Sequence, residues 1–249
     1  MHLTLQALVL RVTPYKDTDA MLTLLCGNYG LLTVKARGLR RKNNPMTAAC
    51  QLLAFGEFTL FEYRGVYTLN EAHPIELFEE LRRDIGKLSL GSYFAQVIEN
   101  VSQEDDPSPE LQSLVLNCLY ALSKLDILEC RVKAVFELRC ACIAGYAPDL
   151  HGCYRCGNPF PDRFNVSEGR LECSACRDTG SDGLRLPVNP GTVEAIRYIC
   201  SCEPRRLFAF RIGEEGLSYL CQLSETYLAV QLERGFSTLD FYKSVQIRV

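Results

Sequence analysis

The N-terminal part of the chain alternates between apolar and polar positions with the two-residue period of β-strands. The segments LTLQALVLRV and MLTLLCGNYGLLTVKARG predict three strands, with a tight turn over 27–30 between the second and the third. Two further strands are predicted in LLAFGEFTLFEYRG and VYTLNEA, which Arg64 and Gly65 separate. Five short strands in about 70 residues favour a small closed barrel, with an OB-fold as the first candidate and an SH3-like barrel as the second.

From His73 and Pro74 onward the period changes, and apolar residues recur at spacings of three and four, as on amphipathic helices. Ser108 and Pro109 are suited to the first positions of a helix. Later helices are predicted over 128–144, which would end at Gly145, and in two segments nearer the C-terminus, 189–202 and 214–235.

These elements predict an α+β multidomain protein with three parts. An OB-fold β-barrel would span 1–74, and a helical domain would be built from 75–147 together with 188–249. Between the two helical stretches lies a loop-rich, cysteine-containing insertion, 148–187, predicted to be a zinc knuckle. The helices on either side of this insertion are expected to pack as one domain.

The composition is ordinary for a globular protein with a real core: 249 residues, 47% hydrophobic and 23% charged. No apolar run approaches the ~20 residues needed to span a bilayer, so no membrane association is expected. The opening segment MHLTLQALVLRV lacks a basic leader and is interpreted as a strand, not a signal peptide. A cytoplasmic location is therefore predicted.

Thirteen cysteines are many for that compartment, where thiols are kept reduced. Nine of them lie within or beside apolar segments and are interpreted as small buried hydrophobic residues. The other four form two pairs, CYRC at 153–156 and CSAC at 173–176, with sixteen residues between them. Two C-x-x-C turns at this spacing are typical of a four-thiolate zinc ribbon, so Cys153, Cys156, Cys173 and Cys176 are the predicted ligands of one Zn²⁺.

Other chemistries are open to the same four cysteines. A thioredoxin-like redox pair would need a strand–helix context that neither pair has, four thiolates can also hold an iron–sulfur cluster, and two disulfides would contradict the compartment. His151 precedes the first pair and is interpreted as a bystander, because four sulfurs already complete a tetrahedral shell. A complete shell leaves no position for substrate, so the predicted zinc is structural.

The segment KARGLRRKNN, residues 35–44, concentrates positive charge in a chain whose formal net charge is −3. Its cations are Lys35, Arg37, Arg40, Arg41 and Lys42, and no Asp or Glu lies between Ala20 and Gly56. Such a segment is either a loop that aids solubility or a polyanion site. OB barrels bind oligonucleotides through one sheet face and its bordering loops, and phosphates attract Lys and Arg. We therefore predict that these five residues contact nucleic acid.

Aromatic side chains, which single-strand binders use for base stacking, are also present in the barrel segment. They are Tyr15, Tyr29, Phe58, Phe61, Tyr63 and Tyr67, and several of them are expected in the core.

No catalytic constellation is recognisable. The three histidines, His2, His73 and His151, stand in no Ser/His/Asp, HExxH or H-x-E arrangement, and the sequence contains neither a G-x-x-x-x-G-K-[ST] phosphate loop nor a G-x-G-x-x-G fingerprint. A two-metal nuclease would need convergent buried Asp residues, and the β segment has almost none. We predict that the protein is not an enzyme.

In this order and spacing the motifs resemble the RecO family of bacterial DNA repair proteins, which are recombination mediators. The resemblance covers nearly the whole chain. It is carried by ALVLRVTPYKDTDAMLTLLCGNYGLLTVKARGLRR at the start, FELRCACIAGYAPDLHGCYRCG before and into the first cysteine pair, and YLAVQLERGFSTLDFY near the end.

The resemblance implies an N-terminal OB-fold, a helical domain and a zinc knuckle. It further implies binding to single- and double-stranded DNA, annealing of complementary strands, cooperation with RecR, and help to RecA in displacing SSB, whose acidic C-terminal tail the family recognises. For that tail the sequence suggests the helix after Leu128, where Arg131 and Arg139 accompany apolar residues. The overall acidity departs from a typical DNA binder and suggests a confined footprint or help from a partner.

Two other interpretations stay open at this point. One is an adaptor that binds only proteins through its barrel and knuckle, and the other is a metal-dependent enzyme with an open zinc site.

Overall fold

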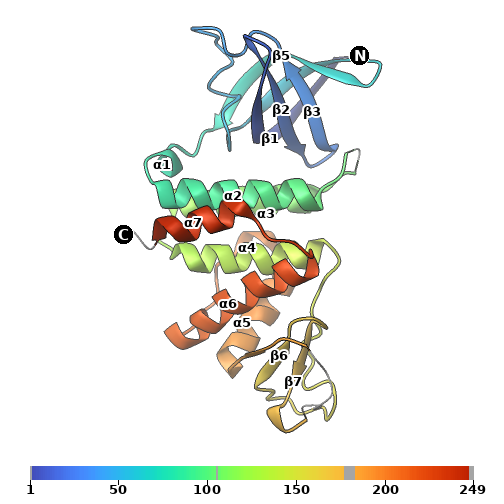
Figure 1. Cartoon of the computed structure of the whole chain (residues 1–249), viewed down its shortest axis with the longest axis vertical. Coiled ribbons are helices and arrows are strands. Elements are labelled where there is room, and N and C mark those ends of the chain that lie inside the picture. Colours follow the sequence, from blue (N-terminus) through green and yellow to red (C-terminus); the bar gives the residue numbers. More distant parts are fainter. Residues whose placement is uncertain (1, 105, 177–182, 247–249) are drawn as a thin grey trace. The chain divides into compact units, whose positions relative to one another are not determined.

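The computed structural model of the chain describes residues 2–104, 106–176 and 183–246 (Figure 1). It contains two compact units. Unit 1 comprises residues 1–125 and 236–249, and unit 2 comprises residues 126–235. Unit 1 thus combines the barrel with helices that the sequence assigned to a separate helical domain. The predicted three-part division into 1–74, 75–147 with 188–249, and 148–187 stays a prediction.

Unit 1 begins with five strands that close into a barrel. They are β1 (His2–Tyr15), β2 (Asp19–Cys26), β3 (Gly30–Ala36), β4 (Phe55–Tyr63) and β5 (Val66–Glu76). Their order around the barrel is β1-β2-β3-β5-β4, with β4 paired back to β1. The β3–β5 pair is parallel and every other pair is antiparallel. A closed five-stranded barrel of this order confirms the predicted OB-fold.

The barrel core follows from the alternation in the sequence. Leu22, Leu24, Leu32, Val34 and Leu60 point inward and are almost completely buried, while the residues between them face outward. The connection between β3 and β4 contributes further apolar side chains to this core, namely Leu39, Ala49, Cys50 and Ala54. The cationic segment of residues 35–44, called the basic turn below, leads from the end of β3 into this connection, and the remainder of the connection covers the barrel core.

The prediction that the helical region starts at His73 is wrong, because β5 continues to Glu76. Gly56 of β4 pairs with Pro74, next to a shift of register between Phe55 and Gly56. Proline is tolerated in a strand where the ladder is interrupted in this way, because its missing N–H is not needed there.

Four helices complete unit 1: α1 (Glu79–Arg82), α2 (Ile85–Val101), α3 (Pro109–Lys124) and α7 (Ser237–Gln246). Helix α3 begins at Pro109 with Ser108 as its N-cap residue, as predicted, although the Ser108 side chain makes no capping hydrogen bond. Helix α7 was not predicted. It packs along α2, and the ring of Phe236, just before it, lies 5.6 Å from that of Tyr93.

The described part of unit 2 consists of three helices and a small sheet. The helices are α4 (Glu129–Ile143), α5 (Pro190–Ser201) and α6 (Glu214–Gln231), each within a few residues of its predicted bounds. The sheet has the order β7-β6-β8 and consists of β6 (Arg163–Asn165), β7 (Arg170–Glu172) and β8 (Arg185–Pro187). Short 3-10 turns cover Ser174–Cys176 and Pro204–Arg206.

The predicted hairpin with its turn near Gly169 is present as β6 and β7. None of the helices within the described ranges is both long enough and apolar enough to cross a membrane.

Candidate metal centre and nucleic-acid interface

Two tight turns present the four cysteines of unit 2. In the first turn, the Cys153 N–H donates to the Asn158 carbonyl (2.9 Å) and the Gly157 N–H donates to the Cys153 carbonyl (2.8 Å). Gly157 adopts a φ of 72°, which favours glycine. In the second turn, the Cys176 N–H donates to the Cys173 carbonyl (3.0 Å), directly after β7. Each turn thereby directs two sulfurs to the same side.

The four sulfurs converge on one point. All four Sγ atoms lie within 4.8 Å of one another, and those of Cys156 and Cys173 are 3.9 Å apart. A tetrahedral zinc site with Zn–S bonds of about 2.3 Å places its sulfurs roughly 3.8 Å apart, so the spacing fits a four-thiolate metal site. All thirteen cysteines lie in the described ranges and all are free, which leaves no support for the two-disulfide alternative.

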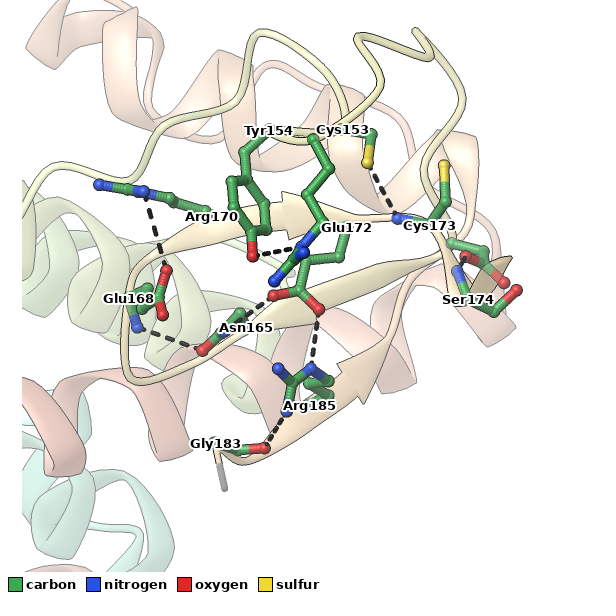
Figure 2. A network of polar contacts seen from close by, with 12 residues as sticks. Cys153, Tyr154, Asn165, Glu168, Arg170, Glu172, Cys173, Ser174, Gly183 and Arg185 are labelled. Atoms are coloured by element: carbon green, nitrogen blue, oxygen red, sulfur yellow. Dashed lines mark hydrogen bonds and ion pairs between the residues drawn. The ribbon is translucent and has the colours of Figure 1, made fainter. Parts of the chain in front are cut away.

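The surroundings favour the thiolate form at Cys153. Burial opposes ionisation there, but backbone N–H groups of Cys156, Arg155 and Cys173 prevail and lower the pKa of the Cys153 thiol to about 6. Of these donors, the Cys173 N–H donates to the Cys153 sulfur at 3.3 Å. Figure 2 marks this hydrogen bond with a dashed line. The Asn158 side-chain amide donates to the Cys173 sulfur at 3.2 Å. Such hydrogen bonds orient metal-binding thiolates and stabilise their charge.

A polar network holds the hairpin that carries Cys173 (Figure 2). Glu172 accepts hydrogen bonds from the Asn165 amide (2.8 Å) and from Arg185 Nε (2.7 Å), and its side chain is only 2% exposed. Burial opposes ionisation, but Arg185 and Asn165 lower the pKa of Glu172 below its usual range. The network links β6, β7 and β8, so the position of Cys173 depends on all three strands. His151 instead contacts Asp149 (2.9 Å) and is not among the four converging residues.

The basic turn of unit 1 has a defined conformation. Gly38 has a φ of 63°, and its N–H donates to Asp19 Oδ1 at 2.8 Å. The Asn44 side-chain amide donates to the Gly38 carbonyl at 2.9 Å, while its oxygen accepts from the Met46 N–H at 2.9 Å. The Gly38 N–H lowers the pKa of Asp19, and Lys35 lowers it further against the opposing effect of burial.

Sequence reasoning missed the roles of Asp19 and Asn44 in holding this turn. For Asn44 a signal was present, because Asn followed by Pro favours a turn in which the side chain bonds to the backbone two residues on. Asp19 carried no comparable signal, because its contact with Gly38 joins two separate strand ends.

The five predicted DNA-contacting cations divide into two groups. Lys35 is half-buried on β3, with its Nζ 3.9 Å from Asp19 Oδ2 and 5.2 Å from the centre of the Tyr15 ring. Arg40 is exposed, but its Nη1 donates to the carbonyls of Lys16 (3.3 Å) and Asp17 (3.4 Å).

The second group consists of Arg37, Arg41 and Lys42. Their side chains are exposed, and none of the ion pairs found within the described ranges involves them. The turn therefore leaves three of its five charges available to solvent or to a ligand.

Arg131 and Arg139 have partners inside unit 2. Arg131 donates to the carbonyls of Phe208 (3.1 Å) and Phe210, and its guanidinium lies 4.3 Å from the centre of the Phe210 ring. Arg139 donates to the carbonyls of Ile199 and Cys200 in the last turn of α5, where a cation is favoured. These contacts give both residues a structural role that the sequence did not indicate. Their suggested role in binding an SSB tail stays a prediction.

Comparison with known proteins covers almost the entire chain. Residues 1–78 match the family described as Recombination protein O N terminal, and residues 82–240 match the family described as Recombination protein O C terminal. The first match coincides with the barrel.

Among curated proteins, the DNA repair protein RecO of Acetivibrio thermocellus is 30% identical over 246 residues, which is 98% of this chain and 97% of that protein. The DNA repair proteins RecO of Alkaliphilus metalliredigens and Heliobacterium modesticaldum are each 28% identical. These matches cover 98% of this chain and all of the former protein, and 96% of this chain and 89% of the latter. The chain therefore belongs to the RecO family of DNA repair proteins.

Proposed function

We propose that this protein is a DNA-binding recombination mediator that anneals complementary single strands during DNA repair. The observation that carries the proposal is the basic turn of the barrel, from which Arg37, Arg41 and Lys42 extend without an ion pair within the described ranges. Asp19 and Asn44 hold the backbone of this turn in place before any ligand binds. A preorganised cationic loop beside an OB barrel is suited to phosphate contacts.

Annealing follows from charge neutralisation. Two single strands repel each other through their phosphates, and a protein that binds both reduces this repulsion and raises their local concentration. Base pairing then supplies the free energy of duplex formation, so no covalent bond is made or broken and no catalytic group is required. The net charge of −3 confines the attractive surface to a small part of the molecule.

The four-cysteine centre is proposed to hold one structural Zn²⁺. Cys153, Cys156, Cys173 and Cys176 would complete its tetrahedral shell, and the buried Glu172–Arg185 pair would support the surrounding hairpin. An iron–sulfur cluster bound by the same residues is the alternative, and metal analysis with optical absorption distinguishes the two.

Family membership supports partners that the structure does not contain. We propose that the protein works in the cytoplasm at the nucleoid, cooperates with RecR and helps RecA to replace SSB on single-stranded DNA. For the SSB tail we keep Arg131 and Arg139 as the candidates. Arg131→Ala and Arg139→Ala would each weaken binding of an acidic peptide with an apolar C-terminus, and unchanged affinity at unchanged thermal stability would exclude both.

The main proposal is tested by charge reversal in the turn. In the variant Arg37→Glu/Arg41→Glu/Lys42→Glu we expect at least roughly tenfold weaker binding of a fluorescent single-stranded oligonucleotide at 50 mM salt. If all three cations contact phosphates, the negative slope of log K against log salt should also become shallower by about 2. Annealing of SSB-coated strands should slow in parallel. Arg40 is left unchanged because its contacts with the Lys16 and Asp17 carbonyls give it a structural role.

The matched control makes the same change in net charge elsewhere. Arg205, Arg206 and Arg211 of unit 2 are also exposed, and their replacement by Glu should leave both the affinity and the salt slope close to those of the wild type. Equal losses in the two triple variants would mean that only net charge matters. Unchanged binding and annealing in the turn variant would favour an adaptor that binds proteins only.

A further inference from the structure

We infer that an outward-facing band across β3, β5, β4 and both ends of β1 stacks the bases of single-stranded nucleic acid, next to the phosphate contacts of the basic turn. This inference rests on the proposed function and extends it from the backbone of the strand to its bases. We define the band by its outward side chains, which are Lys35, Thr68, Phe61, His2, Tyr63 and Val66, together with Tyr15 beside Lys35.

Strand register places these residues side by side. Lys35 of β3 pairs with Thr68 of β5, Thr68 pairs with Phe61 of β4, and Phe61 pairs with His2 of β1. Neighbouring strands lie about 4.8 Å apart, so Lys35 and Phe61 are roughly 10 Å apart across the sheet. This distance is within the reach of two or three nucleotides.

A second row lies at the end of the β4–β5 hairpin. Tyr63 pairs with Val66 two positions along each strand from Phe61 and Thr68, and residues two apart share a face of the sheet. The strand alternation therefore directs Tyr63 to the same outer surface as Phe61. In Figure 1 the labelled N-terminus and this hairpin lie at the same end of the barrel, in agreement with the His2–Phe61 pairing.

Two aromatic side chains of the band, Phe61 and Tyr63, are exposed to solvent. Tyr63 is 60% exposed and Phe61 39%, and Val66, the first residue of β5, is 58% exposed. The His2 ring packs against that of Phe61, with their centres 5.3 Å apart. These exposed aromatic rings leave apolar surface in contact with water. The fold does not need them for its core, because other residues fill the interior of the barrel.

Cations accompany the aromatic rings at both ends of the band. Lys16 and Lys35 lie 5.5 and 5.2 Å from the centre of the Tyr15 ring, and the Arg64 guanidinium lies 5.2 Å from the centre of the Tyr63 ring. Two acids of this region already accept hydrogen bonds from the backbone, Asp19 from Gly38 and Glu62 from Gly65.

Aromatic rings interleaved with cations characterise surfaces that stack bases while binding the adjacent phosphates. The arrangement favours a single-stranded nucleic acid over an apolar protein segment, for which the cations would supply no partner. A duplex would not use the rings, because its bases are already stacked.

The chain contains no tryptophan, so one introduced tryptophan reports on the band alone. The variant Tyr63→Trp keeps an aromatic ring at the hairpin end, and we expect a 20-nucleotide oligo-dT to quench its fluorescence. Tyr120→Trp is the control, because Tyr120 is a similarly exposed tyrosine on α3 of the same unit. No quenching at Tyr63→Trp, or equal quenching at both positions, would overturn the inference.

The affinity test removes the rings and keeps the apolar bulk. In Phe61→Leu/Tyr63→Leu we expect oligo-dT to bind roughly fivefold more weakly or worse, by the usual contribution of a stacked base. Binding of an abasic strand of the same length, and of duplex DNA, should stay unchanged. Tyr120→Leu should change none of the three affinities.

The outcomes separate this inference from the proposed function. If the double Leu variant binds oligo-dT like the wild type while charge reversal in the basic turn weakens it, the band does not stack bases but the protein is still a DNA binder. If the wild type binds oligo-dT and the abasic strand equally well, the inference fails in the same way. If the wild type binds neither strand, both the inference and the proposed function fail.

Discussion

The cysteine knuckle of unit 2 and the basic turn of unit 1 arrange their functional side chains in opposite ways: those of the knuckle converge and those of the turn diverge. In the knuckle, four side chains converge until their sulfurs lie within 4.8 Å of one another, with two of the cysteines buried. In the turn, the backbone is fixed by Asp19 and Asn44 while the side chains of Arg37, Arg41 and Lys42 extend outward. Converging thiols suit a small ion that stays bound, and diverging cations suit a long polyanion that must be released.

The comparison predicts different responses to mutation. The knuckle should lose its fold when its ligand is removed, whereas the turn should lose affinity for its ligand and keep its fold.

The largest effect is expected from removal of the metal. A structural zinc contributes about 10 kcal/mol or more to the folding of a small site at neutral pH. If the proposed zinc is bound, Cys173→Ser should therefore reduce the zinc content from one per chain to well below one and make residues 153–176 sensitive to protease. Cys202→Ser, at a free cysteine of the same unit outside the metal group, should retain one zinc. Full zinc content in Cys173→Ser would show that Cys173 is not a metal ligand.

A smaller loss of stability is expected when the buried ion pair between Glu172 and Arg185 is broken. Glu172→Ala removes the carboxylate that accepts hydrogen bonds from the Asn165 amide and Arg185 Nε, and removal of one partner of a buried ion pair costs about 3–5 kcal/mol. The urea concentration at the midpoint of unfolding of unit 2 should fall accordingly. Glu168→Ala, at an exposed carboxylate of the same hairpin, should have little effect. Equal midpoints for the two variants would show that the pair does not support the hairpin.

The smallest effect concerns the turn and depends on pH. The pKa of Asp19 is lowered from its ordinary value of 3.8, so the contribution of its ionised form is complete above about pH 5 and is lost as the pH falls through the lowered pKa. The Gly38 amide resonance should shift between pH 5 and pH 2 as the carboxylate that accepts its hydrogen bond is protonated. In Asp19→Asn the amide oxygen can accept the same bond without titrating, so this shift should disappear. An identical shift in both proteins would exclude Asp19 as its cause.

The two regions also differ in how well the sequence predicts them. The four cysteines were identified from spacing alone, because a C-x-x-C pair fixes the local geometry of its own ligands. The barrel was predictable for a related reason, since alternation of apolar residues determines which face of each strand is buried. The basic turn was located from its charge, but the separation of its cations into contacted and available groups depends on residues of another part of the barrel. These are Lys16 and Asp17 in the β1–β2 turn and Asp19 at the start of β2.

Helix α4 shows a further limit of sequence reasoning. Lys133 is almost completely buried and lies between Glu137 (2.9 Å) and Glu225 (2.8 Å), so a charged residue occupies a position that a hydrophobic pattern assigns to the surface. The partner Glu225 lies on α6, far along the chain. The roles of Arg131 and Arg139 were hidden for the same reason, since carbonyl groups leave no signature in a sequence.

The interrupted sequence of unit 1 has a consequence for how the protein is made. Helix α7 contributes Leu239 and Tyr242 to the interior of unit 1, yet it leaves the ribosome only after the whole of unit 2. At ordinary rates of translation this delay is on the order of ten seconds, during which the surface of α2 that α7 will cover remains open to water. A nascent chain stalled before residue 236 would carry a folded barrel while the apolar face of α2 that α7 covers is still exposed. Exposed apolar surface of this kind is a feature that chaperones bind.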